Sequence, residues 1–197
     1  MVRGSHVVIG AYGFWLPNDP RGSWSEFIGS WELFRHGGAT TTDTQRSVAH
    51  AAHDRGARLA AKRSLARSAV RFTGVQARAV ARGFGVYAER AGLAVWACAV
   101  LPDHVHLVLG RHRLPVESLV TQLKGHAVKR LAEEELHPFQ NAARAAGAVP
   151  KCFARGAWKV FLDTSDDVRR AISYVERNPE KEGLRRQRWR FVTVFTG

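Results

Sequence analysis

The sequence contains little cysteine and has no long apolar runs. Its 197 residues include two cysteines, Cys98 and Cys152, which lie far apart and in no metal-type spacing. They argue against a disulfide framework and against a structural zinc site, and they fit a reducing compartment. No apolar run approaches the ~18–20 residues of a membrane span, and the N-terminal residues lack a signal peptide's long apolar centre. We therefore expect a cytoplasmic protein.

Acidic residues are also scarce beside basic ones. Lys and Arg total 30 against 17 Asp and Glu, which gives a net charge of +13 and a pI near 10.9. Such an excess attracts a chain to polyanions. Nucleic acid is the commonest of these partners, because each neutralised phosphate releases counterions. A generally basic composition would explain the same charge without any partner.

The order of the predicted elements indicates one α+β domain over residues 1–197. We predict strands over 6–14, 93–101, 104–109 and 158–162, and helices over 73–90, 115–136 and 164–178. The first six of these, in chain order, match a ferredoxin-like β-α-β-β-α-β plan with an antiparallel sheet, and the last helix is an addition. An insertion at about 15–72 with pieces of helix and a basic tail at about 180–197 complete the chain.

Two histidines lie two residues apart in the strand predicted over 104–109. Because side chains alternate along a strand, His104 and His106 leave the same face of the sheet. Two neutral imidazoles on one face can bind a divalent cation, although two solvated surface histidines would give the same pattern. A metal site also requires a third protein ligand.

The helix predicted over 164–178 offers that third ligand. Tyr174 and Asn178 are four residues apart, so they are neighbours on the flank of its apolar stripe. An amide oxygen from Asn178 is a hard ligand suited to Mg²⁺ or Mn²⁺. Taken singly, Tyr174 could be a packing residue and Asn178 a helix cap before Pro179, which is expected to end the helix.

Taken together, these segments resemble the IS200-like single-tyrosine transposases, a group of HUH endonucleases, and their REP-associated relatives. Residues 101–109 (LPDHVHLVL) resemble the family's His-hydrophobe-His strand. Residues 158–162 (WKVFL) and 171–179 (AISYVERNP) resemble its closing strand and tyrosine helix. The resemblance covers about 93–184 and the first strand, whereas the segment over 15–72 is longer than the family usually carries.

The resemblance implies a DNA transposase that nicks and rejoins single strands. Tyr174 would be the nucleophile, forming a 5′-phosphotyrosine and releasing a 3′-OH. His104, His106 and Asn178 would hold Mg²⁺ or Mn²⁺. The expected partner is single-stranded, hairpin-forming DNA, bound by a monomer or a homodimer at the bacterial nucleoid. The candidate nucleic-acid-binding residues are basic or aromatic, namely Lys124, Lys129, Arg130, Arg185, Arg186, Arg188 and Trp189.

Other readings of the same residues stay open. A domesticated module could keep the fold and grip DNA hairpins without cutting them, although such a binder would not need all four of the site residues. An unrelated metallo-hydrolase with a His-x-His pair is a weaker alternative, because a cupin would have a Glu a few residues on, and residues 110–113 (GRHR) provide none. His36, His50 and His53 are further candidate ligands in the inserted segment.

Overall fold

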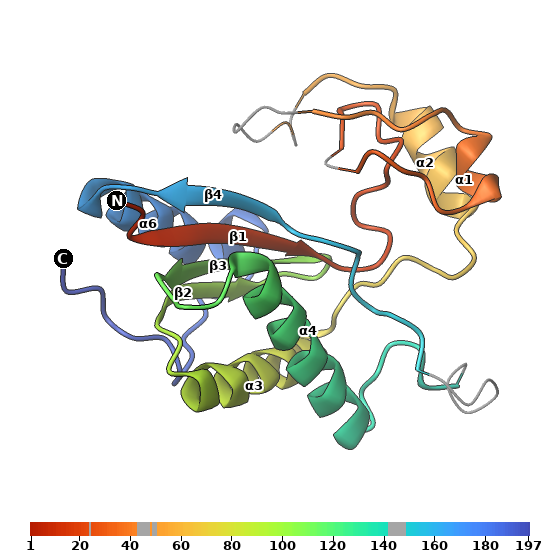
Figure 1. Cartoon of the computed structure of the whole chain (residues 1–197). Helices are drawn as coiled ribbons and strands as arrows, with labels where there is room; N and C mark the ends of the chain where they lie inside the picture. Colours follow the sequence, from red (N-terminus) through yellow and green to blue (C-terminus); the bar gives the residue numbers. More distant parts are fainter. Residues whose placement is uncertain (24, 43–47, 49–50, 142–148) are drawn as a thin grey trace.

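A four-stranded sheet with the order β2-β3-β1-β4 lies at the centre of the computed structural model, which describes residues 1–23, 25–42, 48, 51–141 and 149–197 (Figure 1). The strands are β1 (Gly4–Gly10), β2 (Val95–Val100), β3 (His104–Gly110) and β4 (Trp158–Leu162). All three pairings are antiparallel. The ferredoxin-like α+β plan expected from the sequence is confirmed.

Two helices, α3 (Gly74–Ala91) and α4 (Val116–Glu133), cover one face of this sheet (Figure 1). The expected capping box starts α3, because Thr73 and Gln76 each bond the other's backbone N–H, and Gly92 ends it with a φ of 62°. The helices approach closely at Gly83, where a Cβ would lie 2.6 Å from the Cα of Ala127. Their apolar sides and the inward residues of the strands form the main core.

The opposite face is covered by α6 (Ser165–Lys181). Val168, Ala171 and Val175 pack there against residues of β2 and β3. The expectation that Pro179 ends this helix was wrong, because the helix continues to Lys181. Proline fixes φ near the helical value, so it can continue a helix, although it lacks the N–H that would bond the carbonyl of Val175 and crowds that carbonyl. The Pro179 carbonyl is still used, since it accepts from the N–H of Leu184 at 2.8 Å.

Between β1 and α3 the chain leaves the sheet and forms a lobe, defined here as the described residues of 11–72 (Figure 1). It contains α1 (Trp31–Phe34), which the sequence did not suggest, and α2 (Arg55–Arg63). Leu16, Leu33 and Ala61 form a small apolar cluster of its own. The strand expected to reach residue 14 stops at Gly10 because the backbone turns at Gly13, whose φ is 79°.

The C-terminal tail runs along the free edge of β2. The Gln187 side chain bonds both the N–H and the C=O of Val100 at 2.8 Å, and the N–H of Thr193 donates to Val95 at 2.8 Å. The tail thereby covers an edge strand whose backbone groups would otherwise be exposed. Across the described part of the chain, none of the helices has the length and apolarity that crossing a membrane requires.

Candidate active site

His104 and His106 leave the sheet on the side covered by α6, as strand alternation predicted. In the register of β1 and β3, His104 lies opposite Gly10 and His106 opposite Val8, and their ring centroids are 4.8 Å apart. His106 is buried under α6, and His104 is half-buried at the start of β3. The two side chains that the motif singled out therefore converge at one place.

A third histidine, His6 of β1, joins them, and the sequence analysis missed it. Its Nε2 lies 3.0 Å from Nδ1 of His106, and the two rings stack with centroids 5.3 Å apart. A single histidine 100 positions from its partner carries no local motif. The one sequence signal for His6 was the alternation of side chains along β1. Val7 and Ile9 point into the main core, so His6 lies on the opposite face, where His104 and His106 lie.

Both rings of the His-x-His pair are held through the same nitrogen. Nδ1 of His104 lies 2.7 Å from Oδ1 of Asp103, and Nδ1 of His106 bonds His6. Asp103 is itself held by Arg71 at 3.2 Å. Each ring thus keeps Nε2 for another partner, which is how metal-binding histidines are oriented by a second hydrogen bond.

Burial keeps the imidazoles of His6 and His106 neutral near pH 7. Burial lowers the pKa of His6 to about 4. Burial, followed by the charges of His104, His6 and Lys181, holds the pKa of His106 well below its ordinary range. Burial alone would raise the pKa of Asp103, but the hydrogen bond from His104 and nearby positive charges lower it, so this group stays a carboxylate. Neutral imidazole is the form that binds a metal ion.

Tyr174 of α6 stands over the histidines with its ring turned edge-on. Its centroid lies 5.6 Å from that of His106 and 5.7 Å from that of His6, and the residue is 40% exposed. Lys181 places its Nζ 4.6 Å from the centre of the phenol ring. The other two tyrosines lie elsewhere, since Tyr87 is buried in α3 and Tyr12 packs against Phe139.

Asn178 lies one turn after Tyr174 and is buried. The amide Nδ2 is enclosed without a hydrogen-bond partner, and an unpaired buried polar group costs about 1–3 kcal/mol. The two ends of an amide have the same shape, so a turned side chain would present its oxygen instead.

The donors at this site fit a divalent ion. Two imidazoles whose Nε2 atoms have no hydrogen-bond partner among the described residues, together with one amide oxygen, make a three-donor set of the kind that holds Mg²⁺ or Mn²⁺ with further ligands from phosphate or water. Over the ranges that the structure describes, no three His, Cys, Asp or Glu side chains gather as a metal site. A third donor from this part of the chain would have to be the amide oxygen of Asn178.

The predicted DNA-binding residues of α4 face away from this site, because α4 covers the other side of the sheet. Lys124 is half-buried and donates to the carbonyls of Ala154, at 2.8 Å, and Gly156. Burial, then the charge of Lys151, lowers its pKa to about 8. Its observed contacts tie the loop before β4 to α4. Lys129 and Arg130 are paired with acidic residues of the same helix.

The tail residues divide into two groups. Arg185, Arg186 and Arg188 are exposed, and Arg186 pairs with Glu176 at 2.7 Å. Trp189 is half-buried against the main core, and its Nε1 donates to the Cys98 carbonyl at 3.1 Å. The structure thus gives the indole a packing contact on β2.

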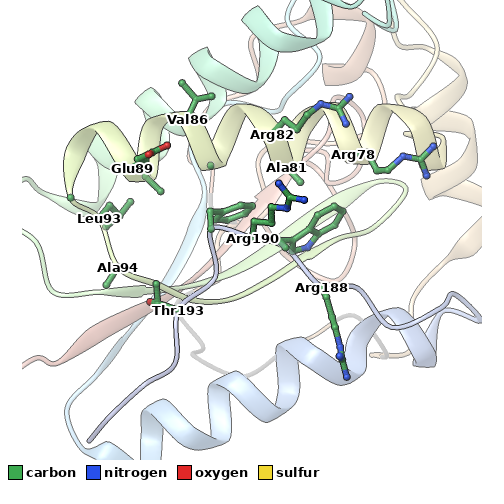
Figure 2. A pocket seen from close by; sticks show the side chains of 15 residues that line it. Arg78, Ala81, Arg82, Val86, Glu89, Leu93, Ala94, Arg188, Arg190 and Thr193 are labelled. Atoms are coloured by element: carbon green, nitrogen blue, oxygen red, sulfur yellow. The ribbon is translucent and has the colours of Figure 1, made fainter.

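A groove of about 810 Å³ lies between α3 and the tail. Its lining includes Arg78, Arg82, Arg188 and Arg190 around the rings of Trp189 and Phe191. Figure 2 shows Arg190 projecting towards α3 and Arg188 projecting away from it. This groove is separate from the histidine cluster, because α3 and α6 cover opposite faces of the sheet.

The histidines of the inserted segment make local contacts. Nε2 of His36 lies 2.5 Å from Oγ of Ser64, and Nδ1 of His53 lies 2.8 Å from the carbonyl of Ala51. His50 falls outside the described residues. The described pair does not join His104 and His106.

No protein-family model matches the sequence, and no curated protein matches it. Two solved structures are similar to the chain. A REP-associated tyrosine transposase bound to a REP hairpin is 12% identical, with 93% of this chain and 70% of that chain covered and a TM-score of 0.45. A candidate transposase from Deinococcus radiodurans R1 is 15% identical, with 95% of this chain and 94% of that chain covered and a TM-score of 0.42.

Proposed function

We propose that the protein is an IS200-like transposase that nicks and rejoins single-stranded DNA with Tyr174 as its nucleophile. The observation that carries this proposal is the phenol of Tyr174, which is 40% exposed and whose ring lies beside those of His106 and His6, with His104 next to His106. Tyr174 and the buried amide of Asn178 both belong to α6, which covers the face of the sheet that His104 and His106 leave. No other tyrosine of the chain lies beside them.

In the proposed reaction the Tyr174 oxygen attacks the phosphorus of a phosphodiester. The bond between phosphorus and the 3′-oxygen breaks, the phenol proton leaves, and the 3′-oxygen gains a proton. A Mg²⁺ or Mn²⁺ ion held by His104, His106 and Asn178 would supply positive charge to the phosphate oxygens. A second 3′-OH can later displace the tyrosine and join new ends, because the phosphotyrosine keeps the bond energy.

The remaining groups position these reactants. Asp103 and His6 fix the two ring orientations through hydrogen bonds. Lys181 adds positive charge beside the phenol, where negative charge develops on the attacking oxygen. The net charge of +13 and the exposed arginines of the tail support a nucleic-acid partner, which we propose to be single-stranded or hairpin DNA.

Covalent trapping tests this function. The protein is incubated with labelled random-sequence hairpin oligonucleotides and Mn²⁺, and adducts are separated on a denaturing gel. Wild type should form an adduct that EDTA abolishes, and Tyr174→Phe should form none, because it lacks only the attacking oxygen. Tyr12→Phe is the matched control and should keep the adduct. Adducts from Tyr174→Phe at wild-type level would overturn the assignment, and DNA binding without adducts from any form would indicate a binding protein.

A further inference from the structure

The lobe of residues 11–72 forms one side of the candidate active site. The Phe14 ring stacks on His104 with centroids 4.5 Å apart and an interplanar angle of 16°. Arg71 reaches the carboxylate of Asp103 at 3.2 Å. Phe14 and Arg71, at opposite ends of the lobe, thus contact His104, the first residue of β3, and Asp103, the residue before it.

A cluster of charges lies in this lobe around Asp19, which is 1% exposed. Arg21 grips both of its carboxylate oxygens, each at 2.8 Å, and stacks over Trp15 at 4.0 Å. Two more cations, Arg58 and Lys62, stand one turn apart on α2 within electrostatic range of this pair. Lys62 also lies within electrostatic range of Asp103, the residue before His104.

Arg58 and Lys62 have no counterion of their own in the described ranges of the chain. Asp19 forms its ion pair with Arg21, and Asp103 pairs with His104 and Arg71. Both cations are half-buried, and Nε of Arg58 is enclosed without a hydrogen-bond partner. Burial, followed by the charge of Arg58, lowers the pKa of Lys62. Uncompensated charges that are partly removed from water favour an anion between them.

We propose that Arg58 and Lys62 bind a backbone phosphate of the single strand beside the one that Tyr174 attacks. A guanidinium and an ammonium one helical turn apart are suited to a tetrahedral oxyanion. The identity of the strand rests on the proposed function, whereas the site itself rests on these charges. The lobe is then a part of the DNA-binding surface, with Phe14 joining it to His104.

Salt-dependent binding tests this proposal with variants of equal charge change. Fluorescence anisotropy of a labelled random-sequence single strand is followed from 0.1 to 1 M NaCl for wild type, Arg58→Gln and Lys62→Gln. The control, Arg63→Gln, lies on the exposed side of α2. Loss of one phosphate contact lowers the slope of log K against log salt by about 0.7, which is roughly a fivefold loss of affinity at 0.1 M. Arg63→Gln should change affinity less than twofold.

A second measurement needs no variant and so does not depend on folding. Brief acetylation followed by mass spectrometry should show Lys62 protected when the single strand is added, while Lys151 stays reactive. Equal losses in all three variants, or an unprotected Lys62, would overturn the proposal. Inorganic phosphate that protects Lys62 when the strand does not would assign the site to a free anion and reject the backbone contact. None of these readouts requires cleavage, so a missing Tyr174 adduct leaves the outcome interpretable.

Discussion

Acid should destabilise this protein through His6 before its carboxylates titrate. His6 is 8% exposed, and burial lowers its pKa to about 4, against 6.5 for the free side chain. Between these values the unfolded chain binds a proton that the folded protein does not. The free energy of unfolding therefore rises with pH across this window, and the stabilisation is complete above pH 6.5 and lost as pH falls towards 4. The difference in pKa corresponds to about 3 kcal/mol.

The variant His6→Gln isolates this effect. A glutamine amide can still bond Nδ1 of His106 but has no proton to gain in this range. Urea unfolding at pH 7.5 and pH 4.8, with EDTA present, gives the free energy of unfolding for both proteins. Linkage with the two pKa values predicts that wild type loses about 2 kcal/mol more than the variant between these conditions. His106 is present in both proteins, and burial, the largest cause of its lowered pKa, acts in both, so most of its own loss is common to them. Equal losses would refute the burial argument.

Two further predictions concern packing and ring orientation. Gly83→Ala should lower the free energy of unfolding by about 1–3 kcal/mol, because the new Cβ would lie 2.6 Å from the backbone of α4. The control Gly125→Ala should not destabilise the protein, because nothing lies within 4 Å of its new Cβ. Thermal unfolding measures both variants, and equal midpoints would contradict the close contact. Asp103→Asn should weaken Mn²⁺ binding about 10–100-fold by calorimetry, because His104 loses its anionic partner, and an unchanged affinity would remove Asp103 from the site.

The parts of the fold that follow local rules were predictable from the sequence. The Thr73–Gln76 capping box is a contact across three residues, and the His-x-His face follows from the alternation of a strand. Both rules act within one element, so no knowledge of the tertiary structure is needed. The same reasoning placed Tyr174 and Asn178 one turn apart, and the structure adds that Asn178 is buried.

The parts that depend on contacts between distant residues were not predictable. His6 becomes a member of the site only through the register of β1 and β3. Trp189 lies in a basic segment that the sequence suggests is exposed, yet its indole N–H donates to the Cys98 carbonyl at the edge of β2. The rule that a proline ends a helix failed at Pro179, since α6, which packs on the sheet, continues to Lys181. Each outcome depends on which surfaces meet in the folded chain.

The energetics of the histidines favour a nicking enzyme over a domesticated binder. Burying His6 and His106 in neutral form removes stability whenever the pH falls below 6.5, and the unpaired amide of Asn178 is a further cost. A protein that only binds DNA gains nothing from these groups, because most phosphate contacts come from arginine and lysine side chains and other hydrogen-bond donors. A protein that must hold a cation beside a phenol recovers the cost on binding, since neutral imidazoles and an amide oxygen are then occupied. Under the proposed function, the position of the Tyr174 ring beside His6 and His106 accounts for that cost.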